Sequence, residues 1–248
     1  MSRPPDRIET LHVVVPVHDE VELLPACLDS LAAAVEHLRT TMPSVRVTTT
    51  VVLDACTDES FAVCRGRDLE VVEVAHRNVG AARAAGIEWA RSREQGGVVP
   101  SERTWVFSTD ADSIVLPDVL TDQVCQADSG ADVVLGRVEP DATAPKIVLD
   151  RWHVAHDDGR VGVHGAHLGF RLSSYDAVGG FAALGEREDL DLVRRLLADG
   201  ARAGAARSII ATSSRLRGRT PGGFAGYLAG LVDLAPSPGP PVGTAPQA

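Results

Sequence analysis

The sequence predicts one α/β domain built on a doubly wound, mostly parallel β-sheet that is flanked by helices. Short β-branched or aromatic runs alternate along the chain with segments whose apolar residues recur at helical spacing. Each predicted strand ends in a polar cluster, and open sheets of this class bind their ligands at the carboxyl ends of the strands. The chain has 248 residues, of which 44% are hydrophobic and 23% charged, and this suffices for one core.

The first predicted strand covers residues 11–17, and its β-branched character indicates burial on both faces, as in a parallel sheet. Apolar residues at helical spacing then predict a helix from Leu23 to Leu38, with Asp19 and Glu22 spaced as a capping box before it. Further elements follow in alternation: strands over 45–53 and 69–74, a helix that ends near Arg93, and a strand that opens at Trp105.

The second half continues the alternation less regularly, and no element is predicted for the polar, His-rich region 140–163. The apolar stretch 224–234 is too short to span a bilayer, and we interpret it as a candidate surface for a homo-oligomer. The tail 235–248 is rich in Pro and Gly and is predicted to be disordered. The predicted elements are a helix over 119–127, a strand over 132–137, a strand-like segment over 166–171, an amphipathic helix over 188–198 and a last strand over 201–211.

The charge and cysteine content argue against several classes of protein. A formal net charge of −10 gives no basic surface for nucleic acid or an anionic membrane. The four cysteines show no C-x-x-C spacing and are expected as free thiols in a reducing compartment. Pro4, Pro5 and Asp6 argue against a signal peptide, and no apolar run reaches the roughly 18–20 residues of a membrane span. We therefore expect a soluble cytoplasmic protein.

Two aspartates one residue apart, Asp110 and Asp112, follow a short apolar run that ends at Phe107. Carboxylates at the end of a buried strand lie where an α/β sheet binds its ligand. Their hard oxygen atoms suit Mg²⁺ or Mn²⁺, which in turn bridge phosphate oxygens. The alternative is that the pair only caps a helix that begins near Leu116.

Six segments, in order along the chain, resemble the motifs of family 2 glycosyltransferases, which have the GT-A fold. The resemblance covers roughly residues 11–199, and six weak motifs in the expected order are specific together. The segments are Val-Val-Pro-Val-His-Asp-Glu at 14–20, Val-Val-Leu-Asp-Ala-Cys-Thr-Asp at 51–58, Asn-Val-Gly-Ala-Ala-Arg at 78–83, Asp-Ala-Asp at 110–112, Gly-Ala-His-Leu-Gly-Phe-Arg at 165–171 with Val-Gly-Gly-Phe at 178–181, and Glu-Asp-Leu-Asp-Leu at 188–192.

The resemblance implies transfer of one sugar, with inversion, from a UDP- or GDP-linked donor to a small-molecule or glycan acceptor. Asp112, with Asp110 toward the ribose or the metal, is implied to hold a divalent cation, Mn²⁺ or Mg²⁺. Such a cation would neutralise the charge that grows on the leaving diphosphate. The chain lacks the Gln-x-x-Arg-Trp motif of processive members, which argues for a single transfer.

The resemblance also implies a donor site at the ends of the first two strands. Pro16, His18 and Glu20 would hold the base and ribose, although a tyrosine is often found where His18 stands. Asp54 would accept a hydrogen bond from an N–H group of uracil or guanine. The alternative for Asp54 and its neighbour Asp58 is local capping of a loop backbone.

Gly80 and Arg83 begin a predicted helix, where a small residue and a cation can face the phosphate or sugar of the donor. The alternative for Arg83 is a solvated position on the helix surface.

On the acceptor side, the resemblance implies that Asp189 is the general base and that Glu188 supports it or contacts the acceptor. Gly165 and His167 fall in the segment that resembles the acceptor side of the family. Carboxylates in a first helical turn are also favoured by the helix dipole, and one residue can serve both purposes.

Two further clusters are candidates for ligand contacts. Four histidines occur between 153 and 167, and we favour His164 and His167 among them for metal or acceptor contacts. Arg215 belongs to a basic loop that could close over the diphosphate, although a solvated loop explains it equally well. The other members of the two clusters are His153, His156, Arg217 and Arg219.

The catalytic domain is predicted to span residues 1–234, with a nucleotide-binding half over about 11–115 and an acceptor half over about 116–234. Two other functions compete with this prediction. A sugar nucleotidyltransferase usually has a glycine-rich loop after its first strand, and residues 16–20 contain no glycine. A non-catalytic nucleotide-sugar-binding protein would bind donor but would be unaffected by Asp189→Asn.

Overall fold

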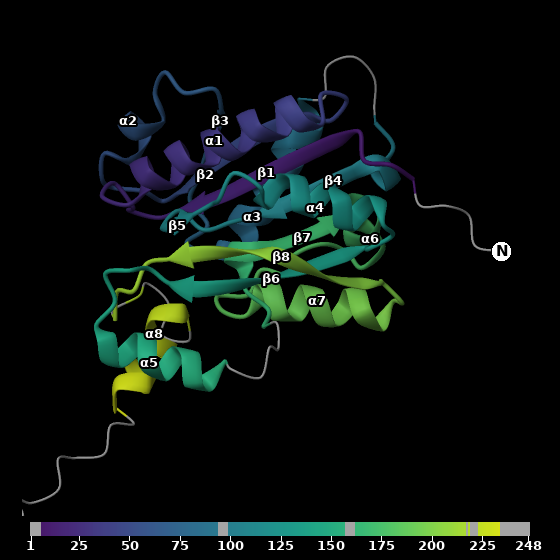
Figure 1. Ribbon diagram of the computed structural model, residues 1–248. Helices are drawn as coiled ribbons and strands as arrows, with labels where there is room; N and C mark the ends of the chain where they lie inside the picture. The colour runs from purple at the N-terminus through teal and green to yellow at the C-terminus, as the bar shows by residue number, and fades with distance from the viewer. Residues whose placement is uncertain (1–5, 94–98, 157–161, 217, 219–222, 234–248) are drawn as a thin grey trace, which may run out of the picture.

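The computed structural model describes residues 6–93, 99–156, 162–216, 218 and 223–233 (Figure 1). They form one eight-stranded sheet in the order β3-β2-β1-β4-β7-β6-β8-β5. The strands are β1 Thr10–Val17, β2 Arg46–Asp54, β3 Glu70–Val74, β4 Thr104–Ser108, β5 Ser113–Ile114, β6 Val133–Pro140, β7 Leu168–Arg171 and β8 Ala203–Thr212. The GT-A-like, mostly parallel α/β architecture predicted from the sequence is confirmed.

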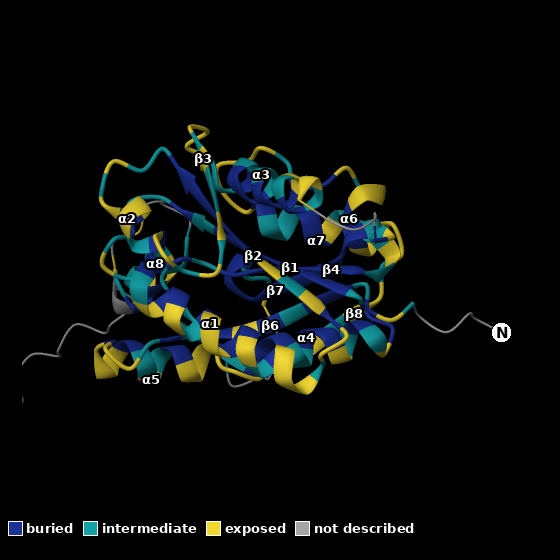
Figure 2. Ribbon diagram, turned by 90° about the horizontal axis from the view of Figure 1, so that it is seen from above, coloured by how far each residue is buried: buried dark blue, intermediate teal, exposed yellow. Residues whose placement is uncertain are grey.

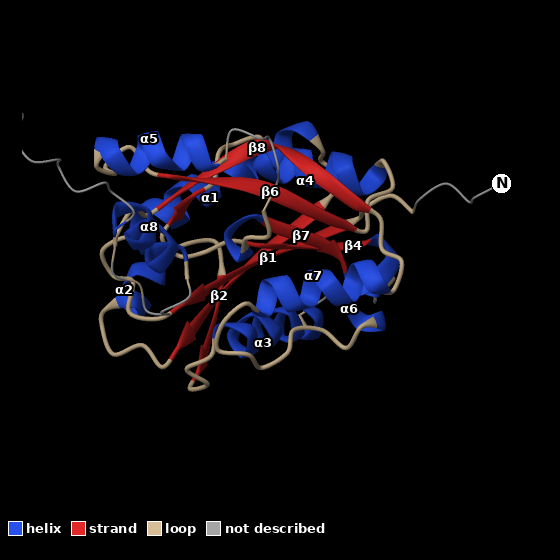
Figure 3. Cartoon of the chain, turned by 90° about the horizontal axis from the view of Figure 1, so that it is seen from below, coloured by secondary structure: helices blue, strands red, loops and turns tan. Residues whose placement is uncertain are grey.

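Helices cover both faces of the sheet. The α-helices are α1 Leu24–Thr41, α2 Ser60–Cys64, α3 Val79–Ser92, α4 Val119–Asp128, α5 Lys146–Ala155, α6 Leu172–Ala177, α7 Glu188–Ala198 and α8 Phe224–Asp233. The sheet lies between α1 and α4 on one face and α3, α6 and α7 on the other (Figure 3). Among the described residues, no helix is long and apolar enough to cross a membrane.

Each face of the sheet has its own hydrophobic core. Figure 2 shows that the central strands are mostly buried, whereas the helices over them carry both buried and exposed residues. Leu31 of α1 and Leu120 of α4 belong to one core, and Ile87 of α3 and Leu196 of α7 belong to the other. A third cluster joins α5 to α8 through Trp152 and four other buried residues. This separate cluster explains why α5 and α8 form a corner of their own beside the sheet (Figure 1).

The strand directions explain where the polar clusters meet. β1 pairs in parallel with β2 and β4, β2 with β3, and β6 with β8. β7 is antiparallel to both β4 and β6, and β5 is antiparallel to β8. The arrowheads of β6 and β8 point left in Figure 1, toward α2, α5 and α8. The carboxyl ends of the parallel strands therefore share one side of the molecule.

Three details of the local structure differ from the sequence-based predictions. Region 140–163, for which no element was predicted, contains α5, and the apolar stretch from Phe224 forms α8, which packs on α5. The two-residue strand β5 was not predicted. The prediction of a capping box before α1 is wrong, because α1 begins at Leu24 without a side-chain cap. Asp19 instead accepts hydrogen bonds from the backbone N–H groups of Thr57, at 2.6 Å, and Asp58, at 3.2 Å.

Candidate active site

A cleft of about 650 Å³ opens at the carboxyl ends of β1, β2 and β4 and extends to α5, α7 and α8. Most of the residues singled out in the sequence line it, although they come from distant parts of the chain. These are Pro16, His18, Glu20, Asp54, Arg83, Asp110, Asp112, Gly165, Glu188, Asp189 and Arg215. Gly80 and His167 do not line it among the described residues.

The two aspartates after β4 have different partners. Asp110 Oδ1 lies 2.6 Å from Arg83 Nη2, and 39% of its side chain is exposed. Asp112 is more buried, with 14% exposed, and its Oδ2 lies 3.0 Å from Arg215 Nη2. The Thr212 hydroxyl donates to Asp112 Oδ1 at 3.2 Å. Each aspartate is thus paired with an arginine from another segment, and neither caps α4, whose N-cap Asp118 makes no side-chain capping bond.

Arg215 connects Asp112 to Glu20, whose side chain is 8% exposed. Its guanidinium donates to both carboxylate oxygens of Glu20, at 2.7 and 2.9 Å, which is the bidentate geometry that arginine favours. The alternative of a solvated arginine is therefore wrong for Arg215. Arg217 and Arg219 lie outside the described residues.

The carboxylates beside Arg215 suit a hard divalent cation. Burial and the neighbouring carboxylates of Asp110 and Glu20 together raise the pKa of Asp112 to about 6, although Arg215 opposes the rise. The single positive charge of Arg215 faces two carboxylates here, those of Glu20 and Asp112, so negative charge is left over. Oxygen ligands with surplus negative charge are what Mg²⁺ and Mn²⁺ bind in proteins. The donor set therefore fits the cation that the sequence predicts.

Arg83 is buried in the wall of the cleft, with 3% of its side chain exposed, so the solvated alternative is wrong for it as well. Its Nε donates to Ser108 Oγ at 2.9 Å, Nη2 to Asp110, and Nη1 to Glu188. Burial alone would lower the pKa of Arg83, but Asp110 and Glu188 raise it above its ordinary value. Arg83 thereby connects α3, β4, the aspartate pair and α7.

Asp54 stabilises the loop that leads into α3. Its carboxylate accepts hydrogen bonds from three successive backbone N–H groups, those of His76, Arg77 and Asn78, at 2.6 to 2.8 Å. The local capping considered from the sequence is thus present, and Asp54 also lines the cleft. His18 Nδ1 lies 2.6 Å from the backbone oxygen of Asp54, which joins the ends of β1 and β2.

Asp189 lies in the first turn of α7, on the opposite wall of the cleft. Its Oδ2 accepts a hydrogen bond from the Gly165 N–H at 2.7 Å, and its Oδ1 accepts one from the Leu190 N–H at 2.7 Å. Its neighbour Glu188 is 5% exposed, and burial raises the pKa of Glu188 while Arg83 opposes the rise. A side chain at Gly165 would collide with the Arg83 guanidinium, so this position needs a glycine.

Gly80 and His167 are structural neighbours of the cleft. A Cβ at Gly80 would lie 2.5 Å from the Ala182 carbonyl oxygen, so glycine lets α3 approach the segment before α7. His167 is completely buried, and its Nδ1 lies 3.0 Å from the Arg137 backbone oxygen. Its ring fills the space that a side chain at Gly136 would need, at the irregularity in the pairing of β6 with β8. The prediction that His167 contacts the acceptor therefore gains no support from its position.

Strained backbone is concentrated around the cleft. Among the described non-glycine residues, four have positive φ: Asp19, Ala55, Arg77 and Arg187, with values from 48° to 59°. This conformation costs about 1 kcal/mol or more per residue and persists only where surrounding contacts enforce it. At Arg77 the Asp54 carboxylate supplies such a contact through the backbone N–H.

A second acidic group lies beside the cleft. Among the described residues, Asp19, Cys56 and Asp58 bring three potential ligand atoms within 4.8 Å of one another. The two carboxylates already accept hydrogen bonds from backbone N–H groups, including that of Val21 at 2.9 Å. These contacts indicate that the group stabilises the loops between β1, β2 and α2.

Sequence reasoning missed an aromatic part of the cleft, which α5 and α8 contribute. Of the four clustered histidines, His156 and His164 line the cleft, whereas His153 is exposed on α5 and His167 is buried elsewhere. Phe224 and Tyr227 of α8 come from the apolar stretch that suggested an oligomer interface. No spacing rule links them to the histidines, because α5 and α8 meet only in the folded chain.

Solved structures share this fold at low sequence identity. S. aureus TarS 1–349 in complex with UDP superposes with a TM-score of 0.59 at 16% identity, covering 83% of this chain and 61% of that one. The mannosyltransferase PcManGT from Pyrobaculum calidifontis, in complex with GDP-Man and Mn²⁺, superposes with a TM-score of 0.58 at 20% identity. The match covers 87% of this chain and 59% of that one. This chain thus spans about three fifths of the length of either.

A third similar structure is glucosyl-3-phosphoglycerate synthase from Mycobacterium tuberculosis, in complex with Mn²⁺, UDP-glucose and phosphoglyceric acid. It gives a TM-score of 0.54 at 15% identity and covers 90% of this chain and 78% of that one. No curated protein sequence matches the chain significantly. The family model described as glycosyl transferase family 2 matches residues 12–166, more than half of the sequence. With its fold, its motifs and this match in agreement, the chain belongs to glycosyl transferase family 2.

Proposed function

We propose that the protein is a metal-dependent, inverting glycosyltransferase that moves one sugar from a UDP- or GDP-linked donor to a hydroxyl group of a small-molecule or glycan acceptor. One observation carries the proposal: the aspartate pair after β4 and the anchored carboxylate of Asp189 line the same cleft. The similar structures that hold UDP, UDP-glucose or GDP-Man support a nucleotide-sugar donor.

Asp112 would hold the divalent cation, with Asp110 and Glu20 close enough to help. When bound, the cation would act as a Lewis acid on the leaving diphosphate. The presence of Mn²⁺ in two of the similar structures supports this assignment. Arg215 already pairs with two of the three carboxylates, those of Glu20 and Asp112, and its remaining N–H groups can donate to a phosphate oxygen.

Asp189 would act as the general base. The acceptor oxygen attacks the anomeric carbon, its proton passes to the Asp189 carboxylate, and the bond from the anomeric carbon to the diphosphate oxygen breaks. Attack from the side opposite the leaving group inverts the anomeric centre. The hydrogen bonds from Gly165 and Leu190 fix the orientation of the carboxylate and leave lone pairs for the acceptor hydroxyl.

The other properties predicted from the sequence remain part of the proposal. The nucleotide-binding half would cover about 11–115 and the acceptor half about 116–234. A cytoplasmic location is supported by four free cysteines. The homo-oligomer stays a prediction, and the tail 235–248 lies outside the described residues.

Calorimetric titration with UDP and GDP, with and without Mn²⁺, tests the donor site. We expect one nucleotide to bind in the micromolar range only when metal is present, and we expect Asp112→Ala to abolish this binding. Asp189→Asn should bind the nucleotide as the wild type does while transfer falls by about 10²-fold or more, because the proton acceptor is lost.

Asp68→Ala is the matched control for both variants, since Asp68 is a surface aspartate that pairs with Arg39 and is 82% exposed. Normal turnover by Asp189→Asn would remove the assignment of the base. Nucleotide binding without turnover in the wild type, tested over a broad acceptor panel, would favour the non-catalytic alternative. Release of pyrophosphate from a nucleoside triphosphate and a sugar phosphate would favour the nucleotidyltransferase.

A further inference from the structure

The aromatic part of the cleft forms a continuous surface next to the proposed base. His164 directly precedes Gly165, whose N–H holds Asp189. The His164 ring lies 6.4 Å from the Phe224 ring, measured between centroids, and the His156 ring lies 5.9 Å from that of Tyr227. We call these four residues, His156, His164, Phe224 and Tyr227, the aromatic patch. All four line the cleft, and Tyr227 is 45% exposed.

Trp152 supports the aromatic patch from behind. Its side chain is 3% exposed, its ring stacks on His156 at 3.7 Å, and it makes edge contacts with Phe224 at 5.2 Å and Tyr227 at 5.7 Å. A buried tryptophan that holds three rings in place makes the patch a preformed surface, and preformed aromatic surfaces are typical of ligand sites.

The polar atoms of the patch suit a neutral ligand. His156 Nδ1 lies 2.8 Å from the Trp152 carbonyl, which can only accept, so in the neutral ring Nε2 carries the lone pair. Burial lowers the pKa of His164, with Asp189 opposing, which favours the uncharged imidazole. Together with the Tyr227 hydroxyl, the patch offers hydrogen-bonding groups at the edges of aromatic faces. A sugar ring presents the matching combination of apolar C–H faces and hydroxyl groups.

The charge around the cleft disfavours an anionic acceptor. Its described lining contains seven carboxylates and four arginines, and no lysine. Two of the arginines, Arg83 and Arg215, are already paired with carboxylates. On the α7 wall Arg187 is flanked by Glu186, Glu188 and Asp189. A phosphate or carboxylate on the acceptor would therefore enter a negative field with little compensation.

We infer that the aromatic patch is the acceptor subsite and that the acceptor is an uncharged sugar or glycoside, which stacks on Phe224 and Tyr227 with its reacting hydroxyl toward Asp189. This inference rests on the proposed glycosyl transfer and adds the chemical class of the acceptor. The glucosyl-3-phosphoglycerate synthase noted above was crystallised with the anionic phosphoglyceric acid, so the two proteins would differ in acceptor class.

Saturation-transfer NMR on the full chain, with the nucleotide and Mn²⁺ present and again without them, tests the inference. The probes are the methyl glycosides of glucose, mannose and galactose, together with glucuronate and glucose phosphate as anionic counterparts. We expect transfer to the ring C–H protons of at least one neutral glycoside and none to the anions. Tyr227→Ala should weaken that binding by about fivefold or more, because a ring contact is lost, whereas Tyr227→Phe should stay within about twofold.

Phe61→Ala is the matched control, since Phe61 is similarly exposed at 41% but lies on α2, outside the cleft lining. It should leave glycoside binding unchanged. Nucleotide binding with no glycoside binding, or binding of the anions independently of Tyr227, would overturn the inference and leave the donor site intact. Absence of both nucleotide and glycoside binding would overturn the proposed function together with the inference.

Discussion

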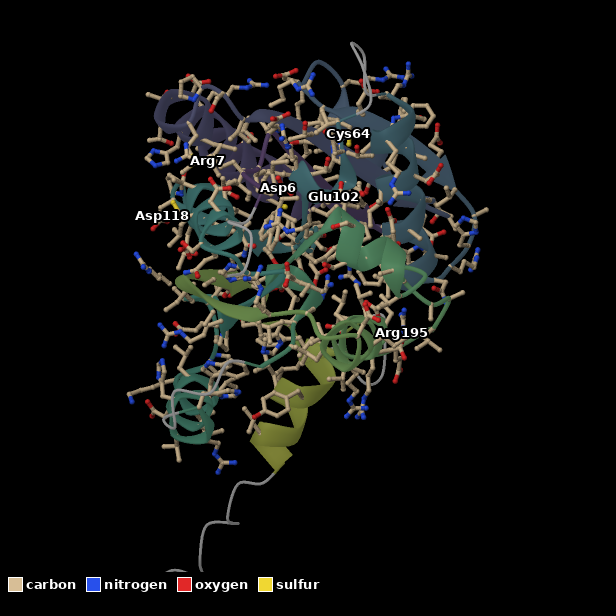
Figure 4. The ribbon with its side chains drawn as sticks, turned by 90° about the vertical axis from the view of Figure 1, so that its right-hand side faces the viewer. Asp6, Arg7, Cys64, Glu102, Asp118 and Arg195 are labelled. Carbon is tan, nitrogen blue, oxygen red and sulfur yellow. The ribbon has the colours of Figure 1, made fainter. Side chains whose placement is uncertain are left out.

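Two buried arginines lie at opposite ends of β4 and differ in what they bind. Arg83, at the carboxyl end, pairs with the carboxylates of Asp110 and Glu188 and with the Ser108 hydroxyl. Arg171, at the amino end, donates to the backbone carbonyls of Asp6, Glu102, Ala127 and Ala131. Figure 4 shows Asp6 and Glu102 next to each other on this side of the molecule.

The different partners have opposite electrostatic consequences. Burial lowers the pKa of Arg171, and its nearest carboxylate, that of Asp132 at 3.6 Å, only partly opposes this. At Arg83 the carboxylates outweigh burial and raise the pKa. Backbone carbonyl oxygens accept hydrogen bonds but, unlike carboxylates, do not take up a proton at neutral pH. The comparison indicates that Arg171 stabilises the fold, whereas Arg83 holds in position two carboxylates that line the cleft.

Of the replacements at Arg83, Arg171 and Arg202, that of Arg83 should have the largest effect on activity and stability. Arg83→Met would leave Asp110 and the buried Glu188 without their cation, which costs about 3–5 kcal/mol when a buried pair is broken. We expect loss of metal-dependent nucleotide binding and of transfer, and a lower free energy of unfolding. Urea unfolding and calorimetry measure the two effects.

The control for this change is the double variant Arg83→Met with Glu188→Gln, which removes the charge from both partners. It should recover part of the lost stability, because no unpaired charge is left, but not the transfer activity. A loss of stability in the double variant equal to the sum of the losses in Arg83→Met and Glu188→Gln alone would show that the pair is not coupled.

Replacing Arg171 should destabilise the protein without changing its chemistry. Arg171→Met would remove four hydrogen bonds to backbone carbonyls, two of them in the buried residues Ala127 and Ala131, at a cost of about 1–3 kcal/mol in the free energy of unfolding. Transfer per folded molecule should stay at the wild-type level, because none of its partners lines the cleft. Urea unfolding and initial rates at a temperature where the variant is folded check this. A loss of turnover without a loss of stability would contradict the assignment of a purely structural role to Arg171.

The smallest effect is expected at Arg202, which is 61% exposed and lies 3.1 Å from Asp132, the same carboxylate that faces Arg171. Arg202→Ala should lower the free energy of unfolding by no more than about 1 kcal/mol, as is typical of exposed pairs. The measurement is the shift in the urea midpoint at unchanged slope. A loss as large as that of Arg171→Met would assign the stabilising role to the Asp132 cluster as a whole.

The elements that could be predicted are those whose signal is local. The β-branched run of β1 and the amphipathic pattern of α7 each require only neighbouring residues. The directions of β7 and β5 and the existence of α5 depend on partners far along the chain. For α5 the pattern was obscured because it packs mainly on α8 and leaves Val154 81% exposed.

The same limit applies to the site. Asp112 and Asp189 could be singled out because they resemble family motifs. The role of Arg83 could not be found, since Glu188 lies 105 residues away and no local pattern tells a buried from a solvated arginine in an alanine-rich helix. The aromatic patch gave no motif either, because Tyr227 and His156 become neighbours only through packing.

The close approach of His167 to Gly136 also restricts how this sequence can change over time. Because the imidazole occupies the volume of any side chain at 136, even alanine there is excluded while the histidine remains. A descendant that gains a side chain at 136 must first lose the ring at 167. The intermediate, with glycine at 136 and a smaller residue at 167, has an unfilled space against β6. A side chain at position 136 therefore requires that His167 be replaced first.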